Sequence, residues 1–240
     1  MDLDGRRPIE SPAIREFEGN WDMASQASQP ALICVIDDDE EVRGSLDSFL
    51  RSAGFDVRTF AGPDDYLACA EADAAACLVL DVRLQGADGL EFQQSLIESE
   101  AHVPVILITG HGDIPMTVRG MKAGAISFLS KPFDEDDMLT AIAEAVERDK
   151  SRRAEEQKGE DVRANYAALT AREREVMGLV TAGLMNKQVA GRLELSEITV
   201  KIHRGNLMRK MKAQSLADLV RMAESLGVRA ASVTRYQSAG

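Results

Sequence analysis

The chain has 240 residues, of which 45% are hydrophobic, so it can bury a substantial core as one large or two small domains. Its net charge of −12 is uneven, because residues 1–145 carry 10 Lys and Arg against 28 Asp and Glu whereas residues 146–240 carry 18 against 12. The longest apolar runs are too short for a membrane span. The three cysteines are odd in number and lack metal-ligand spacing, which argues against a disulfide scaffold and a zinc site. These features predict a cytoplasmic protein without a membrane partner.

The first segment, residues 1–30, is rich in Pro, Ser, Gln and charged residues and shows little periodicity. This composition predicts a disordered N-terminal extension. Trp21, the only tryptophan, is a candidate anchor within it, although a passive tail is the simpler interpretation.

From Ala31 onward, short apolar runs alternate with segments of helical period. In the segment 40–54, Val42, Leu46, Phe49 and Leu50 share one helical face, and Gly54 supplies a C-terminal stop. Strands that alternate with helices require crossover connections and therefore a parallel sheet covered on both faces. We expect an α/β domain over residues 31–148 with a doubly wound, five-stranded parallel sheet, whose strands are 31–36, 56–60, 77–80, 104–109 and 126–130.

Polar side chains follow the strands at the edge where a parallel sheet places its functional crevice. Asp37 and Asp38 follow the first strand, Asp81 the third, Thr109 ends the fourth and Lys131 follows the fifth. Carboxylate oxygens are the ligands that Mg²⁺ prefers, and a lysine and a threonine hydroxyl suit a phosphoryl group. The pattern predicts an aspartate nucleophile, an acid pair that holds a metal, and two side chains that contact the phosphorylated product.

The motifs "VIDDDEEVR", "LVLDVRLQGADG", "ILITGHGD" and "SKPF" occur in this order, and residues 31–148 resemble the receiver domains of two-component response regulators. The resemblance implies that Asp81 accepts a phosphoryl group from a partner histidine kinase. It also implies that Asp38, Asp81 and the backbone carbonyl of Arg83 bind Mg²⁺, with Asp37 acting through water.

Further roles come from the same resemblance. Thr109 and Lys131 would contact the phosphoryl oxygens, and the Lys131–Pro132 peptide is expected to be cis. The switch aromatic falls on Phe128, which has no hydroxyl, so its two states must differ by packing. The two variable positions that tune dephosphorylation in this family are Arg83 and His111.

Residues 149–165 belong to a charge-balanced stretch without a sustained apolar stripe, which predicts a solvated, partly helical linker. Beyond it, the sequence predicts helices only: Thr170 and Glu173 form a capping box, and Ser196 is an N-cap candidate. We expect a four-helix domain over residues 166–228 and a C-terminal tail over 229–240.

Two of these helices, separated by a three- or four-residue turn, predict a helix-turn-helix. On the second of them, Val200, Leu207 and Met211 share the core face, and basic side chains gather on the opposite face, as expected for contact with DNA phosphates. An ordinary amphipathic helix is the alternative.

This half resembles the LuxR/FixJ/NarL-type DNA-binding domain and is similar to the FixJ branch, with the helix-turn-helix over 186–205. Gly205 departs from relatives that carry a basic residue there, so the resemblance does not imply that this chain reads the same bases as those relatives. Leu216, Leu219, Val220 and Ala223 of the last helix face either a dimer partner or their own domain. Double-stranded DNA would be bound by Lys187, Thr199, Lys201, Ile202, His203, Arg204, Gly205 and Arg209.

The resemblances together predict a transcription factor in which phosphorylation of Asp81 promotes homodimerisation and sequence-specific DNA binding, with RNA polymerase as a candidate further partner. The chain would not be an enzyme beyond its own phosphorylation and dephosphorylation. An aspartyl-phosphate phosphatase of the haloacid-dehalogenase type would need a second Asp where this chain has Arg83. A phosphorylation-independent DNA-binding or scaffold protein is another alternative. The charge asymmetry also motivates the hypothesis that the acidic half blocks the basic half before phosphorylation.

Overall fold

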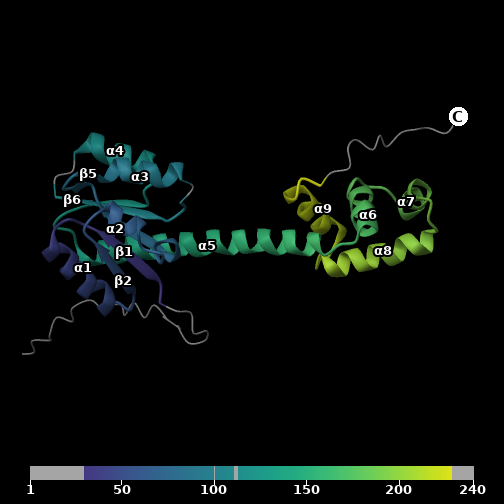
Figure 1. Ribbon diagram of the computed structural model, residues 1–240, viewed down its shortest axis with the longest axis horizontal. Coiled ribbons are helices and arrows are strands. Elements are labelled where there is room, and N and C mark those ends of the chain that lie inside the picture. The colour runs from purple at the N-terminus through teal and green to yellow at the C-terminus, as the bar shows by residue number, and fades with distance from the viewer. Residues whose placement is uncertain (1–29, 100, 111–112, 229–240) are drawn as a thin grey trace, which may run out of the picture. The chain divides into compact units, whose positions relative to one another are not determined.

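The computed structural model describes residues 30–99, 101–110 and 113–228, and Figure 1 shows an α/β part followed by helices only. Residues 1–29 of the expected extension, His111 and the tail at 229–240 lie outside the described residues. The strands are β1 (Leu32–Ile36), β2 (Asp56–Phe60), β3 (Cys77–Asp81), β4 (Arg83–Leu84), β5 (Ala87–Asp88), β6 (Val105–Thr109) and β7 (Ser127–Ser130). The helices of this part are α1 (Glu40–Ser52), α2 (Pro63–Leu67), the 3₁₀ turn η1 (Ala72–Ala74), α3 (Gly89–Glu98), α4 (Ile114–Lys122) and α5 (Glu135–Ala167).

Five of the strands form one parallel sheet in the order β2-β1-β3-β6-β7. The predicted doubly wound, five-stranded parallel sheet is therefore confirmed, and each of the five predicted strands lies in it. The strand order reverses between β1 and β3, which is where open sheets of this kind bind ligands at their carboxyl edge. β4 and β5 form a separate antiparallel hairpin directly after β3.

Alternate residues of the central strands point to opposite faces of the sheet and build two cores. On one face, Leu78 and Leu80 of β3 pack in a cluster with side chains of α2 and α3. On the other face, Val79 packs with side chains of α1 and α5. The apolar face predicted for the first helix is confirmed, because Leu46 and Leu50 are buried there and Val42 and Phe49 pack against the same cluster.

Helix α5 is continuous over 33 residues, so the expected linker at 149–165 is helical throughout. Its middle is anchored by Asp149, which is buried and accepts hydrogen bonds from Arg152 and Arg153. Val162 and Tyr166, near its C-terminal end, pack against the core of the helices that follow. Charged pairs one turn apart, such as Arg152 and Glu156, support the solvated middle of such a helix.

After α5, the described residues form four helices, as predicted: α6 (Ala171–Thr181), α7 (Asn186–Leu193), α8 (Glu197–Lys210) and α9 (Leu216–Ser225). The capping box at the start of α6 is present, since the Thr170 amide donates to Glu173 Oε2 (2.8 Å) and the Glu173 amide donates to Thr170 Oγ1 (3.2 Å). Ser196 caps α8 as expected, because its Oγ accepts from the Thr199 amide. The turn between α7 and α8 contains Glu194 at φ 55°.

The core of the C-terminal helices contains the predicted side chains of α8. Val200, Leu207 and Met211 are fully buried. Leu219 and Ala223 of α9 belong to the same core, so these two side chains are not part of a dimer surface. Within the described ranges, no helix combines the length and the apolar character that a bilayer span requires.

Candidate functional site

The carboxyl edge of the sheet carries a cluster of three aspartates. Asp37 and Asp38 follow β1, and Asp81 is the last residue of β3. One carboxylate oxygen from each side chain lies within 4.8 Å of the others. Asp37 is fully buried and Asp81 is 6% exposed, so water screens their mutual repulsion poorly. The convergence expected from the sequence is present in the fold.

Lys131 bridges two of the three aspartates. Its Nζ donates to Asp37 Oδ2 and to Asp81 Oδ2, both at 2.5 Å. Burial disfavours the ammonium charge, but the hydrogen bonds to the two carboxylates outweigh burial, so the pKa of Lys131 is raised. Burial also raises the pKa of Asp37, although the hydrogen bond from Lys131 opposes it. The Lys131–Pro132 peptide is cis, as expected.

Backbone contacts hold the two buried aspartates in place. Asp37 Oδ1 accepts from the Asp39 amide (3.0 Å), and Asp81 Oδ1 accepts from the Arg83 amide (2.9 Å). Arg43 Nη1 donates to the backbone carbonyl of Asp37 (2.7 Å). Each aspartate therefore uses one carboxylate oxygen for the backbone and the other for Lys131.

Arg43 and Gly89 are two residues of the site that the sequence analysis did not single out. A Cβ added to Gly89 would lie 2.2 Å from the backbone oxygen of Asp81, so only glycine lets the start of α3 lie this close to the end of β3. Gly89 lies within the motif "LVLDVRLQGADG", but nothing in the sequence alone indicates which backbone it approaches. Arg43 has the spacing of an ordinary helix surface residue.

The two predicted switch residues lie on neighbouring strands. Thr109 ends β6 and is fully buried, and Phe128 of β7 is opposite Leu107 in the register. Phe128 is partly buried and packs against the core on the α3 side of the sheet. The third position predicted to act near the phosphoryl group, His111, lies outside the described residues.

The aspartate cluster fits a divalent cation. The cluster has three carboxylates, and the Lys131 ammonium group contacts two of them, so an excess of negative charge remains where water screens it poorly. Burial is the main cause of the raised pKa of Asp37, because it disfavours the carboxylate form. A bound cation would stabilise that carboxylate form. All the donors are hard oxygen atoms, which are the ligands Mg²⁺ prefers.

The second candidate site is the outward side of the helix-turn-helix formed by α7 and α8. Lys187, Lys201, Gly205 and Arg209 are exposed there, and Ile202 is 59% exposed. Three other predicted contacts have roles within the domain or are partly covered. Arg204 Nη1 donates to Asn186 Oδ1 of α7 (3.1 Å), Thr199 Oγ1 lies 2.8 Å from the Ser196 hydroxyl, and His203 is half-buried.

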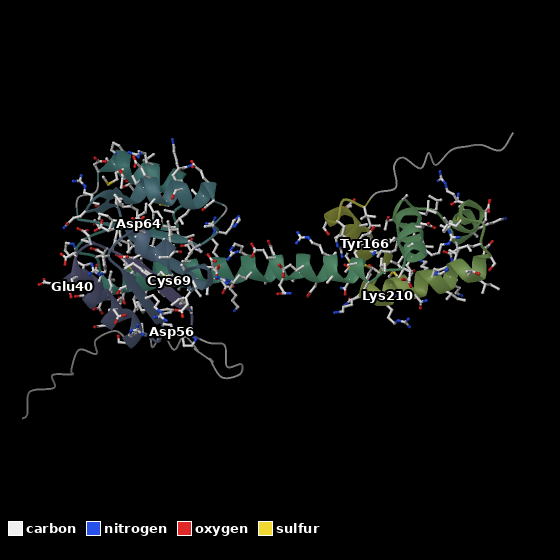
Figure 2. All side chains as sticks on the ribbon, in the orientation of Figure 1. Glu40, Asp56, Asp64, Cys69, Tyr166 and Lys210 are labelled. Carbon is white, nitrogen blue, oxygen red and sulfur yellow. The ribbon has the colours of Figure 1, made fainter. Side chains whose placement is uncertain are left out.

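A contact network joins α8 to the end of α5 and the start of α6. Lys210 Nζ donates to Glu173 Oε2 at 2.7 Å, and Glu173 is buried. Arg174 lies 5.3 Å from the centre of the Tyr166 ring. Figure 2 labels Tyr166 at the end of α5 and Lys210 at the end of α8. These contacts tie the C-terminal end of α8 to α6 and α6 to the end of α5.

Two family models match the two halves of the chain. Residues 33–143 match the response regulator receiver domain, and residues 167–223 match the bacterial regulatory proteins of the luxR family. The chain is 50% identical to nodulation protein W of Bradyrhizobium diazoefficiens over 206 residues, which cover 86% of this chain and 91% of that protein. It is 42% identical to the transcriptional regulatory protein FixJ of the same organism, over 82% of this chain and 96% of FixJ.

The response regulator protein TodT of Pseudomonas putida F1 is 42% identical over 83% of this chain and 88% of TodT. Among solved structures, that of the response regulator StyR superposes with a TM-score of 0.71 at 44% identity, covering 82% of this chain and 99% of StyR. These relatives match both halves of the chain together. The chain therefore belongs to the response regulators that join a receiver domain to a LuxR-family DNA-binding domain, and it is a transcription factor of that family.

Proposed function

We propose that a histidine kinase transfers a phosphoryl group to Asp81 and that this modification promotes dimerisation and sequence-specific DNA binding. The observation that carries the proposal is the contact of Lys131 with both Asp37 and Asp81 in a cluster of three carboxylates. We infer the histidine kinase as a partner from the receiver domain, and we infer DNA as a ligand from the LuxR-family domain.

In the proposed reaction, a carboxylate oxygen of Asp81 attacks the phosphorus, the bond to the kinase histidine nitrogen breaks, and the electron pair stays with that nitrogen. Asp81 is held for this attack by the Arg83 amide and by Lys131. The ammonium group of Lys131 then binds a phosphoryl oxygen in place of the carboxylate oxygen. Mg²⁺ held by Asp37, Asp38, Asp81 and the Arg83 carbonyl would neutralise charge on the transferred group.

A hollow of about 450 Å³ beside the acid cluster supports kinase docking at this edge. It lies between α1 and the segment that links β7 to α5, and Lys131 is one of its lining residues. Val42, Leu46 and Phe49 give it an apolar wall. A helix of the kinase that presents its phosphorylated histidine could therefore rest on α1 while the histidine faces Asp81.

The signal would pass from Asp81 to the face formed by α4 and β7. We propose that Thr109 moves toward the phosphoryl group and that the Phe128 ring then changes its packing. Phe128 has no hydroxyl group, so a change of packing is the only difference between its two states. Helix α4 carries an exposed apolar stripe at i, i+4 and i+7, in which Ile114 is 81%, Val118 44% and Met121 44% exposed. An apolar stripe of this kind is suited to a second copy of the chain.

Once two copies are paired, their α8 helices could occupy two half-sites about one turn of DNA apart. Exposed Lys187, Lys201 and Arg209 would contact phosphates or bases, and half-buried His203 a phosphate. Arg83 and His111 are proposed to set how fast the acyl phosphate is lost. RNA polymerase remains a candidate partner of the DNA-bound dimer.

The test is to incubate the full chain with acetyl phosphate and Mg²⁺ and to measure intact mass, sedimentation and DNA binding. We expect one added phosphoryl group, a shift toward dimer, and tighter binding to DNA that weakens steeply with salt. Asp81→Asn should abolish all three changes, whereas Asp64→Asn, an exposed acid of α2, should retain them. If DNA affinity and the extent of dimerisation were the same with and without acetyl phosphate, the phosphorylation-independent alternative would be favoured.

A further inference from the structure

The outward face of α8 carries an apolar pair that the fold itself does not use. Ile198 is 74% exposed and Ile202, one turn later, is 59% exposed. Neither side chain belongs to the hydrophobic core of the C-terminal helices within the described residues. The core face of α8 is made by Val200, Leu207 and Met211 on the opposite side of the helix. Packing within the domain therefore gives no reason for two isoleucines at these positions.

The residues around this pair are those of a surface that meets a polyanion. At 100° per residue, Lys201, Gly205 and Arg209 fall on the same outward face as the two isoleucines, and all three are exposed. A Cβ added at Gly205 would meet nothing within 4 Å, so the helix presents bare backbone just after Ile202. An apolar pair flanked by cations and a bare turn is suited to close approach into a charged groove rather than to solvent.

We propose that Ile198 and Ile202 are specificity-determining side chains that contact the 5-methyl groups of two thymines in the major groove; this inference rests on the proposed DNA-binding function. Thymine is the only base that presents a methyl group there, and aliphatic side chains select it by apolar contact. Four residues of helix rise about 6 Å. Side chains this far apart reach different base pairs, so each half-site carries two contacted thymines.

Ile198 lies closer than Ile202 to the N-terminal end of α8. It is the second residue of α8, directly after Glu197, and the N-cap contacts of Ser196 with Thr199 fix the backbone on either side of it. The end of a recognition helix that enters the groove first is its N-terminal end. Ile198 thus extends the base-contacting face one turn ahead of Ile202, without any role in the helix cap.

The experiment starts from random-sequence DNA, from which the full chain treated with acetyl phosphate and Mg²⁺ selects its binding sites. Each thymine of the selected half-site is then replaced by deoxyuridine, which removes the methyl group and leaves base pairing unchanged. Affinities are measured for the wild-type chain, for Ile198→Ser and for Ile202→Ser. Ile97→Ser, which alters an exposed isoleucine of α3, is the matched control.

We expect two positions at which deoxyuridine weakens wild-type binding about fourfold, the effect of one buried methyl group. Ile198→Ser should abolish the effect at one position and Ile202→Ser at the other, while the control keeps both. All variants should unfold at the wild-type temperature, because these side chains are exposed. Equal wild-type affinity for thymine and deoxyuridine everywhere, or selected sites without thymine, overturns the inference while leaving DNA binding itself intact. Failure to select any site would instead refute the proposed function.

Discussion

Arg153 joins the middle of α5 to the start of a central strand. Its Nε donates to Asp149 Oδ2 at 2.5 Å, and its Nη2 donates to the backbone carbonyl of Ala75 at 3.1 Å. Ala75 lies just before β3, whose other end carries Asp81. The residue that we propose to be phosphorylated and the helix that continues into the DNA-binding domain are thus attached to the same strand.

Replacing Arg153 with methionine should loosen this attachment. The variant loses the hydrogen bond to the Ala75 carbonyl and one of the two partners of buried Asp149, which should lower the free energy of unfolding of the receiver domain by about 1–3 kcal/mol. Denaturant unfolding followed by circular dichroism measures this loss. Arg163→Met is the control, because Arg163 is exposed on α5 and has no ion pair within the described ranges. Equal stability of the two variants would contradict the role given to Arg153.

The continuity of α5 shows where sequence patterns stop being informative. Beyond Ala145, the helix has no apolar stripe, so the pattern predicted only a solvated, partly helical linker. What holds the helix there is a charge network around Asp149, together with contacts to a loop far away in sequence. Long-range contacts of single side chains leave no periodic signal, whereas the buried strands, with their continuous apolar runs, were predictable.

Gly89→Ala should disturb the site without changing any of its chemical groups. The added Cβ would meet the backbone oxygen of Asp81 at 2.2 Å, so either α3 or the end of β3 must shift. We expect a loss of about 1–3 kcal/mol of stability and phosphorylation by acetyl phosphate that is at least tenfold slower. Intact mass spectrometry over time gives the rate, and thermal unfolding gives the stability.

Gly44→Ala is the control for this substitution. Gly44 lies in α1, and a Cβ there would meet nothing within 4 Å, so alanine should raise stability by about 0.5–1 kcal/mol. A wild-type phosphorylation rate in Gly89→Ala would show that the backbone of Asp81 tolerates displacement, and the positioning role of Gly89 would be wrong.

Two neighbouring acids should differ in their effect on metal binding. Asp38 belongs to the carboxylate cluster, whereas the side chain of Asp39 caps α1 by accepting from the Glu41 and Val42 amides. Asp38→Asn should weaken Mg²⁺ binding at least about tenfold, because a charged oxygen ligand is lost. Asp39→Asn should bind Mg²⁺ normally, since asparagine also caps helices well. The rise in unfolding temperature with added Mg²⁺ measures both affinities, and an equal response of the two variants would assign the metal elsewhere.

The polar groups of the site were predictable because each one ends or follows a strand of a parallel sheet, and such ends meet at one edge. The sequence could not reveal which oxygen atoms face one another, since that depends on strand twist and on the backbone near Gly89. On α8, the core face was predictable from helical period alone. Exposure of Ile198 was not, because an isoleucine near a helix start is as compatible with burial as with contact to a partner.

Acid should weaken the DNA-binding domain through Glu173. Burial would raise the pKa of this carboxyl group, but hydrogen bonds from Lys210 and from the Thr170 backbone outweigh burial and lower its pKa below the ordinary value of 4.5. A carboxylate with a depressed folded-state pKa contributes stability that is present above the unfolded-state pKa. This stability is lost as the pH falls through the folded-state value. The domain should therefore be progressively destabilised below about pH 4.5.

Calorimetry of the full chain from neutral pH downward measures this effect as the fall of the transition that belongs to residues 166–228. Glu173→Gln keeps a side chain that can bond the Thr170 amide but carries no charge, so its transition should start lower and depend less on pH over the same interval. Glu175→Gln is the control: Glu175 also lies in α6, but its partner Arg172 is one turn away on the exposed surface, and such pairs contribute little. If Glu173→Gln and the wild type lost stability in parallel as the pH fell, the contact between Lys210 and Glu173 would not be the source of the acid sensitivity.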